Sequence, residues 1–477
     1  MKPRPALPAG PYLVVGLARS GIAAALALRA RGEDVIGLDA GSPSDVSALR
    51  EAGVETFIDD RDGVALLDRV RAVVKSPGVP AGALPIKAAR ERGIPVLGEL
   101  ELAWRLLQNE FIAVTGTNGK TTTVELIGHI HREAGRPVAV AGNVGTALSS
   151  LIGRLDPAAT VICEASSFQL EDALEFAPEG AVLLNITPDH LDRHGTLAAY
   201  AAAKLEIFAR QGAEDVAVTP ADVAERIAWA ATSADASAPA VLGAPTIPGN
   251  ARLVEFGWDS SAALFELDGE LWWQGGPLIA LERMRLRGRH NVENAMAAAA
   301  VCLANGIDRQ AVCAGLVSFA GVAHRLEEIA ELDGALYVND SKATNVASTL
   351  VALDAFAGRP VHLILGGQGK GQDFTSLREP VQRACAAVYV IGEDALTIAT
   401  ALRNIAPPVL ECGDLGHALE AARKAVQEDG DATSTRASAE GLGPVVLLSP
   451  ACASFDQFAD FEARGEQFRA LVENLQG

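Results

Sequence analysis

Short apolar runs alternate with stretches of helical spacing along most of the chain, and this alternation predicts an α/β fold. In the first segment, Tyr12–Val15 and Val35–Leu38 read as buried strands, with a helix between them at about residues 20–31. The rhythm starts again near Gly98 and once more near residue 322. Because strands that alternate with helices build parallel sheets, we predict successive α/β units along the chain.

Two intervals depart from this rhythm. Residues 244–280 read as hairpin strands around a turn at Asp268 and Gly269, because an Asp-Gly pair between strand-like runs favours a tight turn. Residues 428–443 are poor in hydrophobic residues and rich in Ser, Thr, Gly and Asp, which predicts a mobile surface insertion.

Length and composition are those of a multidomain protein with ample cores. The chain has 477 residues, of which 49% are hydrophobic, and one core rarely serves so long a chain. No apolar run reaches the roughly 18 residues that span a bilayer, and a glycine turn interrupts the region where a secretory signal would need a long apolar run. We expect a cytoplasmic protein. Its six cysteines lack CxxC spacing, so neither a disulfide framework nor a zinc site is predicted.

The formal charge of −20 argues against a nucleic-acid partner, because neutralising a phosphate backbone needs a basic face. An acidic protein that handles nucleotides must concentrate cations locally. Lysines inside glycine-rich motifs therefore carry more weight than ordinary surface lysines.

Residues 111–130 contain the strongest motif. An apolar run ends at Val114, a glycine-rich turn follows, and helical spacing begins at Thr121, so backbone N–H groups converge where the helix starts. Lys120 would reach the β- and γ-phosphates of a nucleotide, and the Thr121 hydroxyl would ligate Mg²⁺. The general phosphate-loop pattern needs a glycine at position 114, so this turn is a shortened variant that opens at Gly116. A plain strand-to-helix connection is the alternative.

Polar residues also follow the next three strands, at the sheet edge where open α/β folds bind ligands. Glu164 could hold Mg²⁺ opposite Thr121, or cap the next helix. His190 alone reads as a packing or capping histidine, and Lys204 alone as a solvated helix lysine. The polar residues at these strand ends are Asn143, Glu164, Ser166, Gln169, Asp189, His190 and His194.

Three further sites have two interpretations each. The GLARSG turn and Asp39 resemble half of a dinucleotide-binding unit, but Ala18 replaces the middle glycine, so a packing turn fits as well. Asn291 and Asn294 could read an adenine edge or cap their helix. Near the end of the chain, three strand ends carry possible anion ligands, either as separate capped loops or as one crevice: Asp340, Lys342 and Thr344; Gly366, Gly367 and Lys370; Ser449 and Ser454.

Longer motifs run from about Gly16 to Phe468: GTNGKTTT, GNVG, EASSFQLE, NITPDHLDRHG, RHNVENA, HRLE, NDSKATN, LGGQGKGQDF and SPACASFDQF. Together they resemble the Mur ligases, the ATP-dependent amino-acid-adding enzymes of peptidoglycan precursor synthesis. GTNGKTT is shared with folylpolyglutamate synthases and selects only the superfamily. GLARSG, NDSKATN and SPACASFDQF look like the glutamate-adding member, and the DNPR motif of the diaminopimelate- or lysine-adding member is absent.

The resemblance implies three domains and one reaction. A Rossmann-like UDP-binding domain would cover residues 1–98, a central P-loop ATPase domain 99–321, and a Rossmann-like glutamate-binding domain 322–477. The enzyme would use ATP and two Mg²⁺ ions to add D-glutamate to UDP-N-acetylmuramoyl-L-alanine through an acyl phosphate. We expect a monomer that binds no nucleic acid and inserts into no membrane.

The resemblance also implies roles for individual residues. The uridine end would contact Arg19, Ser20 and Asp39, and the rest of the muramoyl substrate Gly78, Asn143, Ser166, Gln169 and His190. ATP would be held by Gly116, Thr117, Asn118, Gly119, Lys120, Thr121, Asn291, Asn294, Arg325 and Asp340. One Mg²⁺ would bind Thr121 and Glu164, and a second His190 and a carbamylated Lys204. Thr344, Lys370, Ser454 and the backbone at Phe461 would take the carboxylates of glutamate, with Lys342 close to the reacting phosphate.

Three alternatives stay open at this point. The same ligation with L-glutamate would use the same carboxylate ligands. A folylpolyglutamate synthase-like ligase would use the same phosphate loop. A regulatory module that has lost its chemistry is disfavoured, because Lys120, Glu164, His190, Lys204 and Lys342 are all present.

Overall fold

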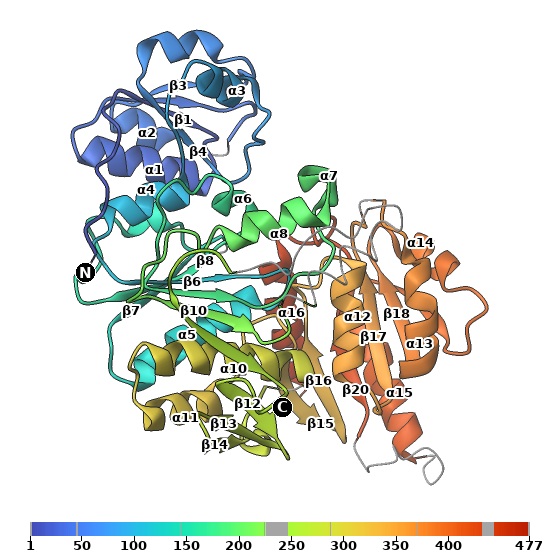
Figure 1. Cartoon of the computed structure of the whole chain (residues 1–477). Helices are drawn as coiled ribbons and strands as arrows, with labels where there is room; N and C mark the ends of the chain where they lie inside the picture. The colour runs from blue at the N-terminus through green and yellow to red at the C-terminus, as the bar shows by residue number, and fades with distance from the viewer. Residues whose placement is uncertain are drawn as a thin grey trace. The chain divides into compact units, whose positions relative to one another are not determined.

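The protein is described by a computed structural model that covers residues 2–43, 46–143, 145–223, 225, 247–286, 288–369, 371–431 and 443–475 (Figure 1). The chain forms two compact units. The first contains Met1–Arg285 and His290–Phe319, and the second Leu286–Arg289 and Ala320–Gly477. Three sheets run through these units, as the alternating pattern predicts.

The first sheet has five parallel strands in the order β3-β2-β1-β4-β5. Tyr12 and Val14 pack in one core while Leu13 and Val15 pack in another, so β1 is apolar throughout because both of its faces are covered. The strands are β1 (Tyr12–Val15), β2 (Val35–Leu38), β3 (Glu55–Phe57), β4 (Ala72–Lys75) and β5 (Val96–Gly98). Its helices are α1 (Arg19–Ala30), α2 (Ser47–Glu51) and α3 (Leu84–Glu91), with the 3₁₀ turn η1 (Val64–Arg69).

The central sheet has nine strands in the order β14-β13-β12-β11-β10-β9-β6-β8-β7. The predicted hairpin is confirmed at β12 and β13, which pair antiparallel, and Asp268 and Gly269 both have positive φ, as a tight hairpin turn requires. Within the same 244–280 interval, β11 instead pairs parallel with β10 and β12, and residues 244–246 lie outside the described part of the chain. The strands are β6 (Phe111–Thr115), β7 (Val138–Gly142), β8 (Thr160–Glu164), β9 (Gly180–Leu183), β10 (Val216–Pro220), β11 (Arg252–Gly257), β12 (Leu264–Leu267), β13 (Glu270–Trp273) and β14 (Gly276–Ala280).

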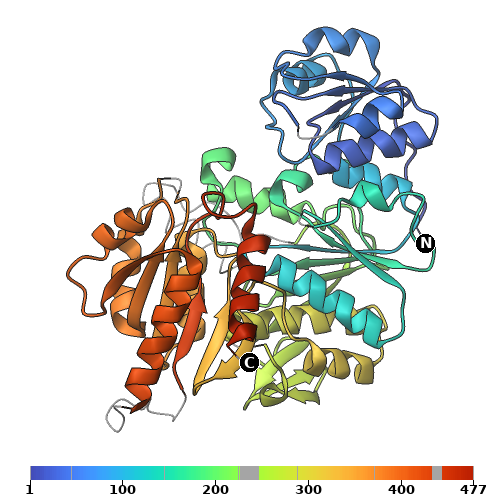
Figure 2. The same cartoon turned by 180° about the vertical axis from the view of Figure 1, so that it is seen from behind.

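Two helices beside the central sheet pack closely against each other. Helices α5 and α11 lie side by side (Figures 1 and 2), and Gly315 allows the close approach, since a Cβ there would lie 2.7 Å from Ile130 Cγ1. The helices are α4 (Glu99–Leu106), α5 (Lys120–Glu133), α6 (Ser167–Leu170), α7 (Leu191–His194), α8 (Leu197–Leu205), α10 (Arg289–Ala304) and α11 (Arg309–Ser318), with η2 (Leu148–Leu151) and η3 (Leu281–Arg283).

The third sheet, in the second unit, has the order β15-β16-β20-β17-β18-β19, and only β15 is antiparallel. Separate apolar cores on its two faces make it a doubly wound sheet. Its strands are β15 (Glu327–Leu332), β16 (Ala335–Asn339), β17 (Val361–Gly366), β18 (Cys385–Ile391), β19 (Val409–Gly413) and β20 (Val445–Leu448). Its helices are α12 (Val346–Ala355), α13 (Arg378–Ala384), α14 (Ala395–Ala401), α15 (Leu415–Asp431) and α16 (Phe461–Asn474), with η4 (Phe374–Leu377).

The α/β fold with three sheets is confirmed, while the domain boundaries at residues 98 and 321 stay predictions. The first four residues of the predicted 428–443 insertion belong to α15, and residues 432–442 lie outside the described part of the chain. All six cysteines are free. Among the described residues, no helix combines the length and apolar character needed to cross a membrane.

Candidate functional site

The glycine-rich loop joins β6 to α5 in the first unit, as predicted. Gly119 has a φ of +86°, and a Cβ there would lie 2.2 Å from Asn294 Oδ1, so a glycine is required both for the backbone conformation and for the neighbouring amide. Lys120 begins α5, and its Nζ donates to the carbonyls of Gly116 (3.0 Å) and Thr117 (2.9 Å). The loop thus places an ammonium group and the N-terminus of a 14-residue helix at one point, which suits an anion.

Asn185 is a residue of this loop that sequence reasoning did not single out. Its Oδ1 accepts hydrogen bonds from the backbone N–H groups of Thr117 (3.1 Å) and Asn118 (2.9 Å), and its Nδ2 donates to the Asn118 carbonyl (3.1 Å). The side chain holds the middle of the loop from the segment that follows the neighbouring strand β9. Its position directly after an apolar strand, in the NITPDH motif, was the available signal.

A carboxylate and a hydroxyl meet beside the start of α5. Thr121 Oγ1 donates to Glu164 Oε2 at 2.8 Å, and Asn143 Nδ2 donates to Glu164 Oε1 at 3.1 Å. Glu164 is buried, and the helix after it is capped by Ser166, so the capping interpretation of Glu164 is wrong. A carboxylate and a hydroxyl beside a phosphate loop are the oxygen donors that Mg²⁺ takes together with nucleotide phosphates, so these residues fit that ion.

Lys204 is buried, so its interpretation as a solvated helix lysine is wrong. Its Nζ donates to the Gly116 carbonyl at 2.8 Å and lies 4.5 Å from the centre of the Tyr200 ring. Burial, and secondarily the nearby Lys120 ammonium, lower the pKa of Lys204 to about 6, against the opposing effect of Asp189 and Glu164. Burial therefore favours the neutral form of the Lys204 amine.

His190 lies close to the same aromatic ring. Its imidazole centre is 6.4 Å from that of Tyr200 and 4.9 Å from that of Phe168, and its side chain is 49% exposed. It occupies the residue before α7 with a φ of +51°, without a side-chain capping bond. His190 and Lys204 therefore both lie close to the Tyr200 ring. Among the described residues, no group of three or more His, Cys, Asp or Glu side chains could hold a metal ion unaided.

Two predicted substrate contacts form a local structural motif. Ser166 caps α6 and accepts from the Gln169 backbone, while Gln169 Oε1 accepts from the Ser166 backbone N–H at 3.0 Å. This reciprocal arrangement is a capping box, which the S-x-x-Q spacing indicates. A role for either side chain toward the substrate stays a prediction.

The N-terminal turn is braced by the acidic residue that follows β2. The Asp39 carboxylate accepts from the backbone N–H groups of Leu17 and Gly41. Arg19 and Ser20 are the first residues of α1, which follows this turn. Gly78 belongs to the turn after the neighbouring strand β4. A uridine contact at these residues stays a prediction.

The asparagine pair on α10 adjoins the phosphate loop. Asn291 and Asn294 are buried, Asn294 Nδ2 donates to Asn291 Oδ1 at 3.2 Å, and the Asn294 amide faces Gly119. Since Asn294 lies in the second turn of its helix, it is not a helix cap. Contact with an adenine stays a prediction.

In the second unit, Asp340 is the centre of a buried polar cluster at the end of β16. Its Oδ2 accepts from Ser449 Oγ at 2.8 Å and its Oδ1 from the Leu326 backbone at 3.2 Å. Burial raises the pKa of Asp340 to about 7, although these hydrogen bonds and Arg325 act in the opposite direction. The Ser449 hydrogen bond thus joins the ends of β16 and β20, which are neighbouring parallel strands, and a single ligand crevice at this sheet edge stays a prediction.

Arg464, in the same unit, was not singled out from the sequence, and through Ser341 it is connected to the predicted residue Phe461. Its fully buried guanidinium donates to Ser341 Oγ (2.9 Å) and to the Cys452 carbonyl (3.0 Å), and burial lowers its pKa to about 10. Ser341 Oγ in turn donates to the Phe461 carbonyl at 2.8 Å, and Lys342 Nζ lies 5.7 Å from the Phe461 ring centre.

The predicted glutamate ligands have mixed outcomes. Ser454 is buried and Thr344 half-buried, both at loops that follow strands of the third sheet. Lys370 lies outside the described residues. Binding of glutamate by any of these residues stays a prediction.

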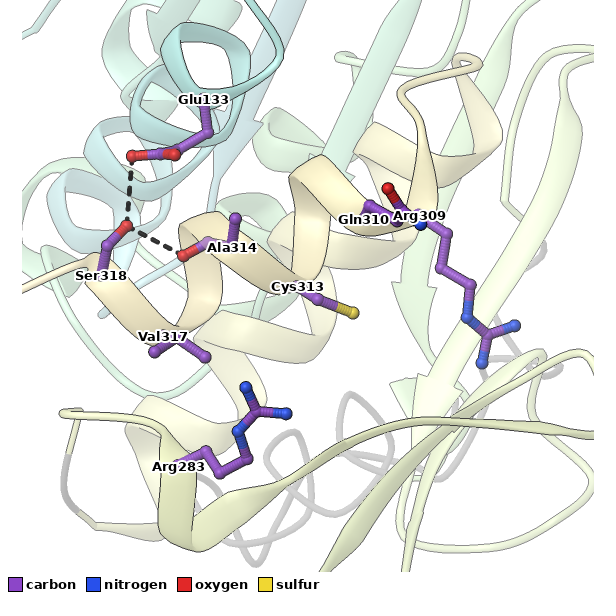
Figure 3. Close-up of a pocket in the computed structure, with 8 residues that line it drawn as sticks. All are labelled: Glu133, Arg283, Arg309, Gln310, Cys313, Ala314, Val317 and Ser318. Carbon is purple, nitrogen blue, oxygen red and sulfur yellow. Dashed lines mark hydrogen bonds between the residues drawn. The ribbon is translucent and has the colours of Figure 1, made fainter.

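A surface hollow lies at the opposite end of α5 from the phosphate loop (Figure 3). It is lined by Glu133, Arg283, Arg309, Gln310, Cys313, Ala314, Val317 and Ser318. Glu133 ends the helix that Lys120 begins, and 14 residues of α-helix span about 20 Å. The hollow is therefore separate from the phosphate loop and takes no part in chemistry there.

Comparison with known families gives matches over most of the chain. Residues 114–302 match the Mur ligase middle domain, and residues 324–438 match the Mur ligase glutamate ligase domain. The chain is 39% identical to the "UDP-N-acetylmuramoylalanine--D-glutamate ligase" of Pelotomaculum thermopropionicum over 479 residues, covering 97% of each chain. It is 43% identical to the enzyme of the same name from Anaeromyxobacter dehalogenans over 469 residues, covering 96% of each.

Solved structures share the fold at low sequence identity. The UDP-N-acetylmuramate-alanine ligase of Thermotoga maritima superposes with a TM-score of 0.57 at 21% identity, covering 98% of this chain and 99% of its own. The folylpolyglutamate synthase of Mycobacterium tuberculosis superposes with a TM-score of 0.55 at 17% identity, covering 76% and 92%. These likenesses support the three-sheet α/β architecture alone.

Proposed function

Because this chain belongs to the Mur ligase family, we propose that it joins D-glutamate to UDP-N-acetylmuramoyl-L-alanine and converts ATP to ADP and phosphate. Similarity to enzymes named for this reaction covers nearly the whole chain, which favours it over folate polyglutamylation. The observation that carries the chemistry is the Thr121–Glu164 contact of 2.8 Å at the phosphate loop. It supplies a place for a nucleotide phosphate and its metal ion together.

The reaction needs ATP because a carboxylate and an amine form only a salt at neutral pH. The terminal alanine carboxylate attacks the γ-phosphorus, which gives an acyl phosphate and releases ADP. The amine of glutamate then adds to the acyl carbon, and the tetrahedral intermediate expels phosphate to leave an amide. Both steps bring anions together, so catalysis rests on positioning and charge neutralisation.

Residues of the first unit have distinct parts in this scheme. Lys120 binds the β- and γ-phosphates from the start of α5, and the loop backbone orients them. Thr121 and Glu164 would hold Mg²⁺, which when bound offsets charge on the phosphate oxygens. Asn143 orients the Glu164 carboxylate through its hydrogen bond. Asn291 and Asn294 would take the adenine. From the second unit, the proposal assigns Arg325 and Asp340 to the nucleotide and Lys342 to the reacting phosphate.

A second Mg²⁺ would bind His190 and a carbamylated Lys204. A carbamate forms when a neutral amine attacks CO₂ and loses a proton, and it turns a nitrogen base into an oxygen ligand. Burial that lowers the pKa of Lys204 to about 6 keeps the amine neutral at pH 7, which favours this modification. The lysine lies beside the loop carbonyl of Gly116, where an added carboxylate would stand near the phosphates.

Removing CO₂ and bicarbonate is expected to lower Mg²⁺-dependent ligation at pH 7.5 to 8, which is above the Lys204 pKa of about 6, and returning bicarbonate is expected to restore it. Restoration should fade as the pH falls through about 6, because the amine becomes protonated. Initial rates in degassed buffer, with and without added bicarbonate, measure both effects. The Lys204→Met variant is the control: it should be slow and indifferent to bicarbonate. Wild-type activity that ignores bicarbonate would leave Lys204 an unmodified lysine.

Glutamate is taken by the second unit in this proposal. Thr344, Lys370, Ser454 and the backbone N–H of Phe461 contact its two carboxylates. Support comes from the match of residues 324–438 to the Mur ligase glutamate ligase domain, and from the polar strand ends of the third sheet. A cytoplasmic monomer with two Mg²⁺ ions stays our expectation.

Phosphate release measured with each amino-acid and nucleotide pair tests the assignment. We expect ATP-dependent phosphate release only with UDP-N-acetylmuramoyl-L-alanine and D-glutamate, accompanied by the ligated product in mass spectrometry. Equal rates with L-glutamate would contradict the assignment of D-glutamate as the specific amino-acid substrate. Phosphate release with a folate, and none with the muramoyl nucleotide, would show that the enzyme is a folate-type ligase instead.

A further inference from the structure

A buried ion pair lies outside the phosphate site, within the first unit. Lys75 ends β4 with its side chain fully buried, and its Nζ is 2.8 Å from Asp172 Oδ2. The Asp172 side chain is 2% exposed, and the two residues are far apart in the sequence. A charge buried this deeply is strongly destabilising without its partner, so the pair fixes the two segments against each other.

On one side, the pair holds the turn that follows β4. Lys75 Nζ also donates to the Val79 carbonyl at 3.0 Å, which ties the lysine to the far end of this turn. Ser76 Oγ donates to the Gly16 carbonyl at 2.6 Å. The 76–79 turn is thereby fixed against the N-terminal glycine turn, and it contains Gly78, a proposed contact of the muramoyl substrate.

On the other side, the pair holds the segment that follows α6. The Asp172 backbone N–H donates to the Gln169 carbonyl at 3.3 Å, and a Cβ added at Gly98 would lie 3.0 Å from Asp172 Cβ. Arg90 Nη2 bonds the second carboxylate oxygen of Asp172 at 2.9 Å, but the Arg90 side chain is 45% exposed. Asp172 is therefore packed directly against the helix that carries Ser166 and Gln169.

We propose that Lys75, through Asp172, is a positioning residue for the muramoyl substrate. It fixes the spacing between the 76–79 turn and α6, which carry proposed contacts to two parts of one ligand. This inference rests on the proposed function, since it assigns these two surfaces to the same substrate. The phosphate loop that would bind ATP joins β6 to α5 and belongs to neither of the two segments that the ion pair holds. Loss of the ion pair should therefore weaken muramoyl binding and leave ATP binding unchanged.

The test compares the Michaelis constants of the two substrates in the full-length enzyme. Lys75→Met retains the length of the side chain and removes its charge, and a displacement of about 1 Å between binding surfaces can cost up to about 100-fold. We expect the KM for UDP-N-acetylmuramoyl-L-alanine to rise about tenfold or more, with the KM for ATP within about twofold of wild type. Asp172→Asn should shift the same constant. Lys87→Met is the matched control, because the Lys87 side chain is 67% exposed and its ion pair with Glu91 lies at the surface.

Each outcome decides the inference. Folded Lys75→Met and Asp172→Asn enzymes with unchanged constants would overturn it. A parallel rise of both constants would also overturn it, because it would show a general distortion of the first unit. If Lys75→Met does not fold, Asp172→Asn, which retains its side-chain shape, carries the same prediction. A wild-type enzyme inactive with the muramoyl nucleotide overturns the proposed function and this inference with it. An active wild type with unaltered variants overturns this inference alone.

Discussion

Lys120→Ala is expected to lower the ligation rate by about 10³-fold, because one ammonium group is removed from the place where negative charge accumulates in phosphoryl transfer. Stability should change little. The variant loses hydrogen bonds to the carbonyls of Gly116 and Thr117, each worth about 1 kcal/mol. It gains from alanine's higher helix propensity and from removal of a cation at a helix N-terminus.

Turnover and the thermal unfolding midpoint together check this prediction. Lys87→Ala serves as the control, since its exposed side chain is remote from the loop in sequence and fold. Near-normal turnover by a folded Lys120→Ala enzyme would remove the phosphate-loop assignment. A collapse of the unfolding midpoint would show instead that the lysine serves mainly to hold the loop.

Glu164→Gln is the second large effect that we expect. Glutamine can still accept a hydrogen bond from Thr121 Oγ1, and Asn143 can turn its amide to accept from the new Nε2. The fold should therefore survive, while the negative charge that attracts Mg²⁺ is lost. Even residues behind metal ligands change affinity or activity by about 10–100-fold, so a direct ligand should cost at least about 10²-fold in turnover.

A Mg²⁺ titration of activity separates this effect from a folding defect. The half-saturating Mg²⁺ concentration should rise in Glu164→Gln, and Glu164→Asp, which keeps the charge on a shorter side chain, should be less affected. A Glu164→Gln enzyme with an unchanged Mg²⁺ requirement would show that the carboxylate does not bind the ion.

Local signals in the sequence were sufficient for the elements around the loop. The strand β6 is apolar because it is covered on both faces, and glycines at the turn are required by backbone geometry, so both features are visible in the residues themselves. The tight turn at Asp268 and Gly269 is similarly local. The capping box at Ser166 also follows from a local signal, the S-x-x-Q spacing, which sequence reasoning did not use.

Contacts between distant residues could not be predicted in this way. Lys204 lies in an alanine-rich helix whose sequence fits a solvated surface, and only the packing of α8 against the loop shows that it is buried. Arg464 and the Lys75–Asp172 pair are charged residues in tertiary contacts between segments far apart in the chain. Charge is normally a sign of exposure, so composition and periodicity predict the wrong environment for all of them.

The central claim is that a carboxylate of the muramoyl substrate accepts the γ-phosphoryl group of ATP, and that an amine then displaces phosphate from the acyl carbon. It is tested most directly with substrate whose terminal alanine carboxylate carries a heavy oxygen isotope in both positions. After ligation with ATP and D-glutamate, mass spectrometry of the released phosphate should show one heavy oxygen, with the other in the new amide. Phosphate without the heavy isotope would contradict the acyl-phosphate route.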